Sequence, residues 1–393
     1  MSNYAIFDLS PDEDSMCLYI RILYGGNKFS DLCDFVQNPS MVDTHVNPEM
    51  QIHPQLQELP FVVLRDVHTE LGRALRTEQK IALIQPQIAK ELAEYEAKEE
   101  FTTAPWVAAH IAEFKYSFFD DVTESMRLFE MILSPAFKAQ LAADVQWAYT
   151  YPRASAIRHL AQIFYEKAEE AHARGESPDA WVEKLRRGAT GRNFGSSSSG
   201  GNAYLVNSFS LSLGSYLRQY HSTSDWKSCF RTPILEAIRI LTDDDPMNDF
   251  DAYARLLEVL LMAGDIKNAT AAADVVFLPL AVNEEYIPAL EKLGFSARRY
   301  TCKGMCTTIS HEYYTDIKEL HFCTVCLGTS FCKDCLKMHK EWNLPFRICS
   351  PQHDFIKLFP VPKDAEDVAA YFDGEVFEVE KGWLESLQKE WDT

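Results

Sequence analysis

The sequence has no apolar run long enough to cross a membrane and no excess of positive charge. Its longest apolar stretches, such as Val275 to Val282, fall far short of the about 20 residues that span a bilayer. Lysine and arginine number 38 against 58 aspartates and glutamates, a formal net charge of −20. A phosphate backbone or an anionic membrane repels such a chain. The charge therefore argues against nucleic acid or a membrane as the main partner and favours a protein or peptide.

Signatures of common catalytic sites are also missing. The chain contains no Gly-x-Ser-x-Gly and no His-Glu-x-x-His. His68 and Glu70 have the His-x-Glu spacing of zinc deaminases, but no Pro-Cys-x-x-Cys follows at a suitable distance. The glycines of Gly188 to Gly201 lack both the Gly-Lys-Ser/Thr ending and the GxGxxG pattern of phosphate loops. These absences favour a protein that is not an enzyme and leave an enzyme as the alternative.

The first residues, MSNYAIFDLSPDED, lack the basic and apolar regions of a secretory signal. Seven of the ten cysteines lie between residues 302 and 349. In a reducing compartment such a group is expected to hold metal as thiolates and not to form disulfides. We expect a soluble protein of the cytoplasm or nucleus, and we assign Cys17, Cys33 and Cys229 to core packing.

Apolar residues recur with helical spacing through most of the chain, including Trp106 to Phe118, Val122 to Leu133 and Ile157 to Ala171. Breaks are predicted at Pro135 and Pro152. We divide the chain into an N-terminal helical and irregular region (1–60), a helical repeat region (61–187), a Gly/Ser-rich linker or loop (188–202), a second helical region (203–295), a metal-binding module (296–362) and an acidic tail (363–393).

The second helical region contains one distinct helical hairpin. Small and apolar residues predict two short helices that cross tightly at a Gly-Asp turn: Tyr253, Leu256, Leu257, Leu260, Ala263, Gly264, Asp265, Ala269 and Ala272. This pattern resembles the tetratricopeptide (TPR) unit, and Leu213 to Phe230 resembles it more weakly. The resemblance implies a TPR-like α-solenoid, in which hairpins stack side by side.

Four pairs of metal-ligating residues follow the helices. The spacing is Cys302-x3-Cys306, sixteen residues, Cys323-x2-Cys326, five residues, Cys332-x2-Cys335, thirteen residues, and Cys349-x3-His353. Two ligands so close on a tight turn reach one tetrahedral ion, so each pair is half of a zinc site. Four half-sites predict two zinc ions.

Alternating half-sites usually pair in a cross-brace, in which the first and third share one ion and the second and fourth share the other. This arrangement assigns one ion to Cys302, Cys306, Cys332 and Cys335, and the other to Cys323, Cys326, Cys349 and His353. His339 is an alternative to His353 in the second set. Four protein ligands leave no position for water, so both zincs are expected to stabilise the fold and not to catalyse a reaction.

These pairs, followed by Leu344-Pro-Phe-Arg-Ile-Cys349-Ser-Pro-Gln-His353-Asp-Phe, resemble the ZZ-type zinc finger, and more closely the ZZ-like terminus of fungal TPR-repeat proteins. The resemblance covers about residues 300 to 360 and implies binding of peptides or protein termini. Cys335, His339-Lys340 and Cys349 also resemble the end of a MYND finger. The alternatives are therefore a MYND/SET-like methyltransferase and a RING-like ubiquitin-ligase component.

The charge changes sign near the C-terminus. Residues 296 to 363 carry ten basic and six acidic side chains, and residues 364 to 393 carry two and ten. Trp383, Leu384, Leu387 and Trp391 predict an amphipathic helix that either docks on the chain itself or binds a partner. Candidate partner contacts near the module are Tyr313, Tyr314, Trp342 and Phe346. We expect a mainly α protein that serves as a zinc-binding interaction scaffold.

Overall fold

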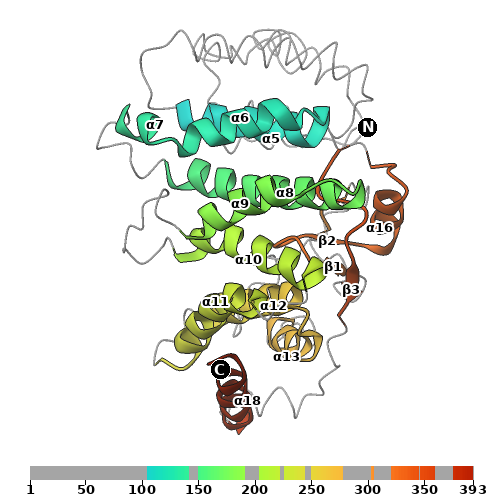
Figure 1. Ribbon diagram of the computed structural model, residues 1–393. Coiled ribbons are helices and arrows are strands. Elements are labelled where there is room, and N and C mark those ends of the chain that lie inside the picture. Colours follow the sequence, from blue (N-terminus) through green and yellow to red (C-terminus); the bar gives the residue numbers. More distant parts are fainter. Residues whose placement is uncertain are drawn as a thin grey trace, which may run out of the picture. The chain divides into compact units, whose positions relative to one another are not determined.

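The computed structural model describes residues 104–140, 149–190, 203–221, 225–243, 249–277, 302–304, 320–344, 346–358 and 375–392. Within these ranges the protein is mainly helical, with one small sheet (Figure 1). The chain divides into two compact units, one of residues 1–156 with 345–347 and one of residues 157–344 with 348–393. Among the described helices, none is both long and apolar enough to cross a membrane.

The first unit contains a helical hairpin of α5 (Ala104–Phe119) and α6 (Val122–Leu133), followed by the short α7 (Pro135–Gln140). Helix α6 begins at Asp121, whose carboxylate accepts a hydrogen bond from the Glu124 backbone N–H at 3.2 Å. The buried Ser125 hydroxyl donates to the Ala112 carbonyl at 2.7 Å and links the two helices. Both helices were predicted from the spacing of their apolar residues, and the structure confirms them.

Helix α8 (Thr150–Ala173) begins in the first unit and continues through the second. Pro152 was predicted to break the chain, but it lies inside the first turn of α8. Proline is tolerated there because the first backbone N–H groups of a helix have no acceptor within the helix. The helix ends at a turn in which Gly175 adopts a positive φ of 71°.

Helices α9 (Asp179–Ala189) and α10 (Ala203–Tyr220) pack against each other. Gly188 lies in the last turn of α9, so the helix continues two residues into the segment predicted as a linker. A Cβ atom on Gly188 would lie 2.3 Å from Cγ of Phe209. The glycine therefore allows the two helices to approach closely. Residues 191–202 lie outside the described part of the chain.

The predicted hairpin with a Gly-Asp turn is confirmed as α12 (Asp249–Ala263) and α13 (Ile266–Val276), which follow α11 (Trp226–Leu241). Gly264 has a φ of +77°, a conformation that favours glycine. The Asp265 carboxylate then caps α13 by accepting from the Asn268 backbone N–H at 3.2 Å. From α9 to α13, each helix packs against the next in the sequence.

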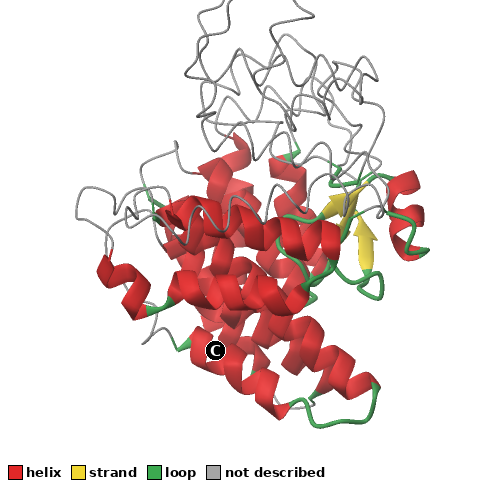
Figure 2. Ribbon diagram, turned by 90° about the horizontal axis from the view of Figure 1, so that it is seen from above, coloured by secondary structure: helices red, strands yellow, loops and turns green. Residues whose placement is uncertain are grey.

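A three-stranded antiparallel sheet of order β2-β1-β3 lies beside these helices in the second unit (Figures 1 and 2). Its strands are β1 (His321–Cys323), β2 (Ser330–Phe331) and β3 (Phe355–Lys357), and α16 (Lys333–Lys340) follows β2. Phe322 of the sheet contacts Phe277, which caps the end of α13, with ring centroids 5.7 Å apart. The module therefore packs directly on the helices of the second unit.

The chain ends in α18 (Glu375–Asp392), which contains the predicted amphipathic stretch. Leu384, Leu387 and Trp391 are buried, and the Trp383 indole donates to the Asn268 side chain at 2.9 Å. Trp383 also stacks on Tyr253 of α12. Of the two roles predicted for this helix, the structure shows docking on the chain's own helices.

Candidate metal centre

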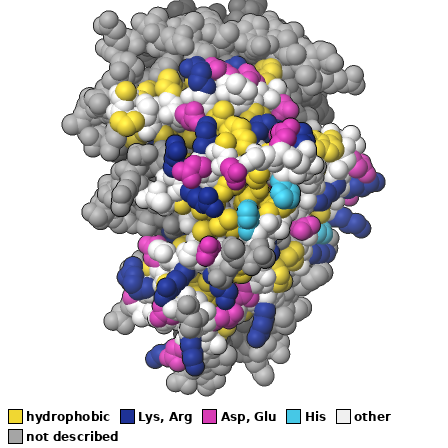
Figure 3. All heavy atoms as spheres, viewed as in Figure 1, with side chains coloured by type: hydrophobic (Ala, Val, Ile, Leu, Met, Phe, Trp, Pro, Cys, Tyr) yellow, Lys and Arg dark blue, Asp and Glu magenta, His cyan; other side chains and the backbone are white. Residues whose placement is uncertain are grey.

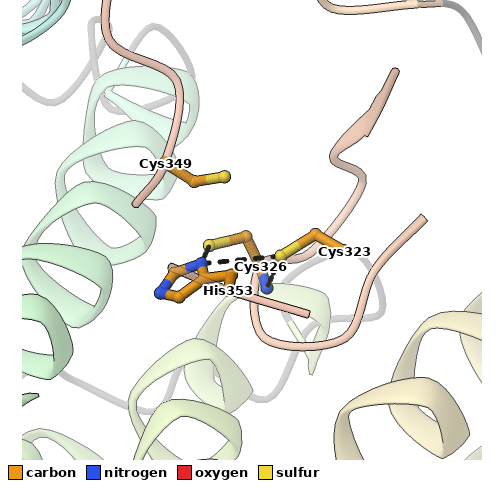
Figure 4. A group of neighbouring side chains, drawn as sticks. All are labelled: Cys323, Cys326, Cys349 and His353. Carbon is orange, nitrogen blue, oxygen red and sulfur yellow. Dashed lines mark hydrogen bonds between the residues drawn. The ribbon is translucent and has the colours of Figure 1, made fainter. Parts of the chain in front are cut away.

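Cys323, Cys326, Cys349 and His353 converge in the interior of the module, with their ligand atoms all within 4.8 Å of one another. Cys323 and Cys326 come from β1 and the turn after it, while Cys349 and His353 come from the segment before β3. The His353 Nδ1 lies 3.4 Å from Cys326 Sγ and 3.6 Å from Cys323 Sγ (Figure 4). The cluster is therefore three sulfurs and one imidazole nitrogen, directed at a common centre.

The turn after β1 is shaped to hold a charged sulfur. The backbone N–H groups of Val325 and Cys326 point at Cys323 Sγ, with N to S distances of 3.4 and 3.3 Å. Hydrogen bonds to a thiolate favour its charged form, and the thiolate is the form of cysteine that binds metal. The backbone thus prepares the first ligand of the cluster.

The cluster without a metal holds one thiolate beside one imidazolium. Burial opposes ionisation of Cys323, but hydrogen bonds from the Cys326 and Cys349 thiols and the charge of His353 hold its pKa below the ordinary value. Burial raises the pKa of Cys349 to about 12, and the hydrogen bond with Cys323 raises the pKa of Cys326. The Cys323 thiolate overcomes the effect of burial on His353 and raises its pKa.

His339, the alternative ligand, is buried, and Cys349 is the cysteine of this group that it contacts. Its Nε2 is 3.5 Å from Cys349 Sγ, and its ring stacks on Phe331 with centroids 4.6 Å apart. Burial lowers the pKa of His339 to about 4. The structure thus places His353 within the four-residue group and packs His339 against aromatic rings.

A second group joins Cys302, Cys332 and Cys335, whose sulfurs also lie within 4.8 Å of one another. The Cys332 backbone N–H points at Cys302 Sγ at 3.2 Å. A Cβ atom on Gly304 would lie 2.4 Å from Cβ of Cys335. A residue with a side chain at position 304 would therefore overlap Cys335. Cys306, the predicted fourth ligand, lies outside the described residues.

Both groups are suited to hold a metal ion. None of the seven described cysteines forms a disulfide, and groups of three or four thiolate and imidazole ligands fit zinc. The N–H groups that point at sulfur and the glycine that makes room for Cys335 are features that a metal-bound thiolate needs. In the four-residue group every donor comes from the protein, so no position is left for a substrate.

The candidate partner contacts lie in different surroundings. Phe346 packs on Phe118 within the first unit, with ring centroids 5.7 Å apart. Trp342, just after α16, is 70% exposed and has a φ of +59°. Tyr313 and Tyr314 lie outside the described residues.

Sequence reasoning did not single out three residues of α8 that face the cluster. Glu169 Oε2 lies 3.6 Å from His353 Nε2, Tyr165 meets the His353 ring edge-on, and Gln162 donates to the Ile348 carbonyl at 2.7 Å. A signal was present, because Glu169 continues the buried stripe of Ala161 and Tyr165 at spacings of four. A carboxylate in such a stripe needs a polar partner.

Comparison of the chain with protein-family models, curated proteins and solved structures gives no match.

Proposed function

We propose that the protein is an interaction scaffold, in which a TPR-like α-solenoid carries a ZZ-like module held together by two structural zinc ions. The observation that carries this proposal is the buried group of Cys323, Cys326, Cys349 and His353. Three of these residues are at most 3% exposed, and Cys326 is 9% exposed. A closed site of this composition stabilises a fold and offers no open position for catalysis.

The second ion is assigned to Cys302, Cys332 and Cys335, with Cys306 as the fourth ligand. This pairing of first with third and second with fourth half-sites follows the cross-brace expected from the spacing. Three short strands, one helix and long connections bury too little apolar surface to be stable alone. Metal bonds supply that stability in small domains.

The scaffold role is supported by the helices and by an exposed aromatic. Consecutive helices pack as neighbours from α9 to α13, as they do in solenoids that present an extended binding surface. Trp342 offers a large apolar surface in a backbone conformation that is unusual for a bulky residue. Free cysteines suit a reducing compartment, and we place the protein in the cytoplasm or nucleus.

The first experiment is metal analysis of the purified full chain by native mass spectrometry. We expect two zinc ions in the wild type and one in the Cys326→Ser variant. Cys229→Ala is the matched control, because Cys229 lies buried in α11 and away from both groups, and it should retain two. A wild-type chain that purifies without metal and does not take up zinc would contradict the proposal.

The scaffold role is tested separately by selecting peptides from a random library on the zinc-loaded chain. We expect an enriched sequence whose affinity, measured by fluorescence anisotropy, falls at least about tenfold in Trp342→Ala and on chelation. Selection that enriches no sequence would leave a zinc protein without the proposed peptide-binding role.

A further inference from the structure

A buried carboxylate from the helical part of the second unit faces the metal cluster of the module. Glu169 on α8 is 8% exposed, and its Oε2 lies 3.6 Å from His353 Nε2. Among the described residues, this nitrogen has no hydrogen bond within the usual distance. A buried ring N–H is rarely left without an acceptor. The Glu169 carboxylate would become that acceptor if Oε2 moved slightly closer than its present 3.6 Å.

The two nitrogens of the His353 ring face different groups. Nδ1 points at the sulfurs of Cys323 and Cys326, and the second nitrogen points away from them (Figure 4). A neutral imidazole carries one N–H, so a metal on Nδ1 requires the hydrogen on Nε2. That hydrogen then lies on the side of Glu169. The tautomer of His353 that binds a metal through Nδ1 is therefore the same tautomer that can donate its Nε2 hydrogen to Glu169.

Glu169 is itself held in place by a neighbouring helix. The Tyr220 hydroxyl on α10 donates to Glu169 Oε1 at 3.1 Å, which leaves Oε2 for the histidine. Tyr165, one turn earlier on α8, packs edge-on against the His353 ring with centroids 5.5 Å apart. Two helices thus fix both the carboxylate and the ring plane. Glu169 lies behind the ring and not among the sulfurs, so it is not placed as a ligand.

We propose that Glu169 is a positioning residue of the metal centre, which sets the tautomer and orientation of His353, and that metal binding is thereby coupled to the packing of α8 and α10. The inference rests on the proposed metal centre. Metal-ligating histidines generally donate their second N–H to such an outer carboxylate, and its loss weakens metal affinity. Here that carboxylate comes from the helices, so the module is completed by them and is not an independent finger.

The test measures zinc affinity of the full chain by competition with a chromophoric chelator. We expect Glu169→Ala to weaken the buried site about 10- to 100-fold and Glu169→Gln to weaken it less, because the amide oxygen still accepts a hydrogen bond. The other site should keep its affinity. Glu170→Gln is the matched control, because the half-buried Glu170 lies one residue further along α8 and pairs with Lys167 and Arg174, not with the metal ligands. It should bind as the wild type does.

A second readout separates positioning from general destabilisation. Cobalt(II) bound at the buried site gives absorption bands that depend on ligand geometry, and we expect these bands to shift in Glu169→Ala and not in Glu170→Gln. Tyr220→Phe removes the hydroxyl that orients Glu169 and keeps the ring, so it serves if Glu169→Ala does not fold. It should weaken the site a few-fold, about as one lost hydrogen bond does.

The coupling predicts one further difference. Adding zinc to the metal-free chain should raise the unfolding temperature of the helices, followed by circular dichroism at 222 nm, more in the wild type than in Glu169→Gln. Wild-type affinity and unchanged cobalt bands in Glu169→Gln, Glu169→Ala and Tyr220→Phe would overturn the inference while the metal centre stands. A wild-type chain that binds no metal would instead overturn the metal centre itself.

Discussion

Gly304 is a residue whose missing side chain matters for the metal site of Cys302, Cys332 and Cys335. A Cβ atom there would lie 2.4 Å from Cβ and 2.5 Å from Sγ of Cys335, closer than real atoms approach. Cys335 is also buried and has little room to move. The close approach of the Cys302–Gly304 segment to Cys335 therefore depends on glycine at position 304.

We expect Gly304→Ala to lose the zinc held by Cys302, Cys332 and Cys335, because the overlap separates Cys335 from Cys302. The zinc at the buried group with His353 should remain. The zinc content of the purified chain, measured by native mass spectrometry, should fall from two to one. Lys303→Ala changes an exposed side chain in the same turn and should leave the content at two. Full zinc content with unchanged affinity in Gly304→Ala would show that the turn tolerates a side chain.

The protonation of Cys323, Cys326, Cys349 and His353 leads to a prediction about how zinc affinity depends on pH. Without metal, Cys326 and Cys349 keep their thiol protons and His353 is protonated, because all three pKa values are raised. Cys323, whose pKa is lowered, is already a thiolate. Binding through three thiolates and a neutral imidazole therefore releases about three protons near neutral pH. Zinc affinity rises with pH and falls as the solution is acidified.

The Cys302→Ser variant leaves only the site of Cys323, Cys326, Cys349 and His353. Its proton release is measured by calorimetric titration with zinc in buffers of different ionisation enthalpy. The slope of heat against ionisation enthalpy should correspond to about three protons per ion. A slope near zero would mean that the ligands are already deprotonated, and the protonation described above would then be wrong.

At the scale of elements, the C-terminal helix is part of the folded core of the second unit. Leu387 is 1% exposed, and Trp391 meets Trp226 of α11 edge-on with ring centroids 6.4 Å apart. Arg231 of α11 also pairs with Asp392 at 2.7 Å. The described apolar residues Leu384, Leu387 and Trp391 of α18 are therefore buried within the second unit, where α18 packs on α11.

We expect Leu387→Ala to lower the free energy of unfolding by about 2 to 5 kcal/mol, the usual cost of removing a buried leucine side chain. Urea unfolding followed by tryptophan fluorescence measures this change. Gln388→Ala, on the exposed side of the same helix, should change the free energy by less than about 0.5 kcal/mol. Equal stability of both variants would show that α18 does not dock in solution.

Helical spacing predicted α5, α6 and the α12–α13 hairpin, because their apolar faces and caps are local patterns. The same reasoning placed a break at Pro152 and a linker from residue 188. Pro152 instead lies in the first turn of α8, where its missing N–H costs nothing. Gly188 instead lies inside the last turn of α9, where Phe209 of α10 occupies the space that a side chain would need. This is a contact between two elements that spacing along the chain does not show.

At the scale of the whole molecule, charge is distributed unevenly. The formal net charge is −20, yet lysines gather around α16, where Lys333, Lys337 and Lys340 are exposed (Figure 3). Charges more than a Debye length of about 8 Å apart in physiological salt are largely screened from each other. A molecule that approaches the module therefore meets a local basic surface, although the chain as a whole is acidic.

The sequence by itself predicted the mainly helical class, the Gly-Asp hairpin and the close pairs Cys323/Cys326, Cys332/Cys335 and Cys349/His353, because each depends on residues close together along the chain. Spacing alone did not distinguish His353 from His339, since both lie a short distance from Cys349. The tertiary structure directs Nδ1 of His353 at the sulfurs of Cys323 and Cys326 and packs His339 on Phe331, so that His353 joins the group of three cysteines. It also brought Glu169 to His353 across 184 positions of the chain, a contact that no local pattern encodes because it exists only once the helices pack.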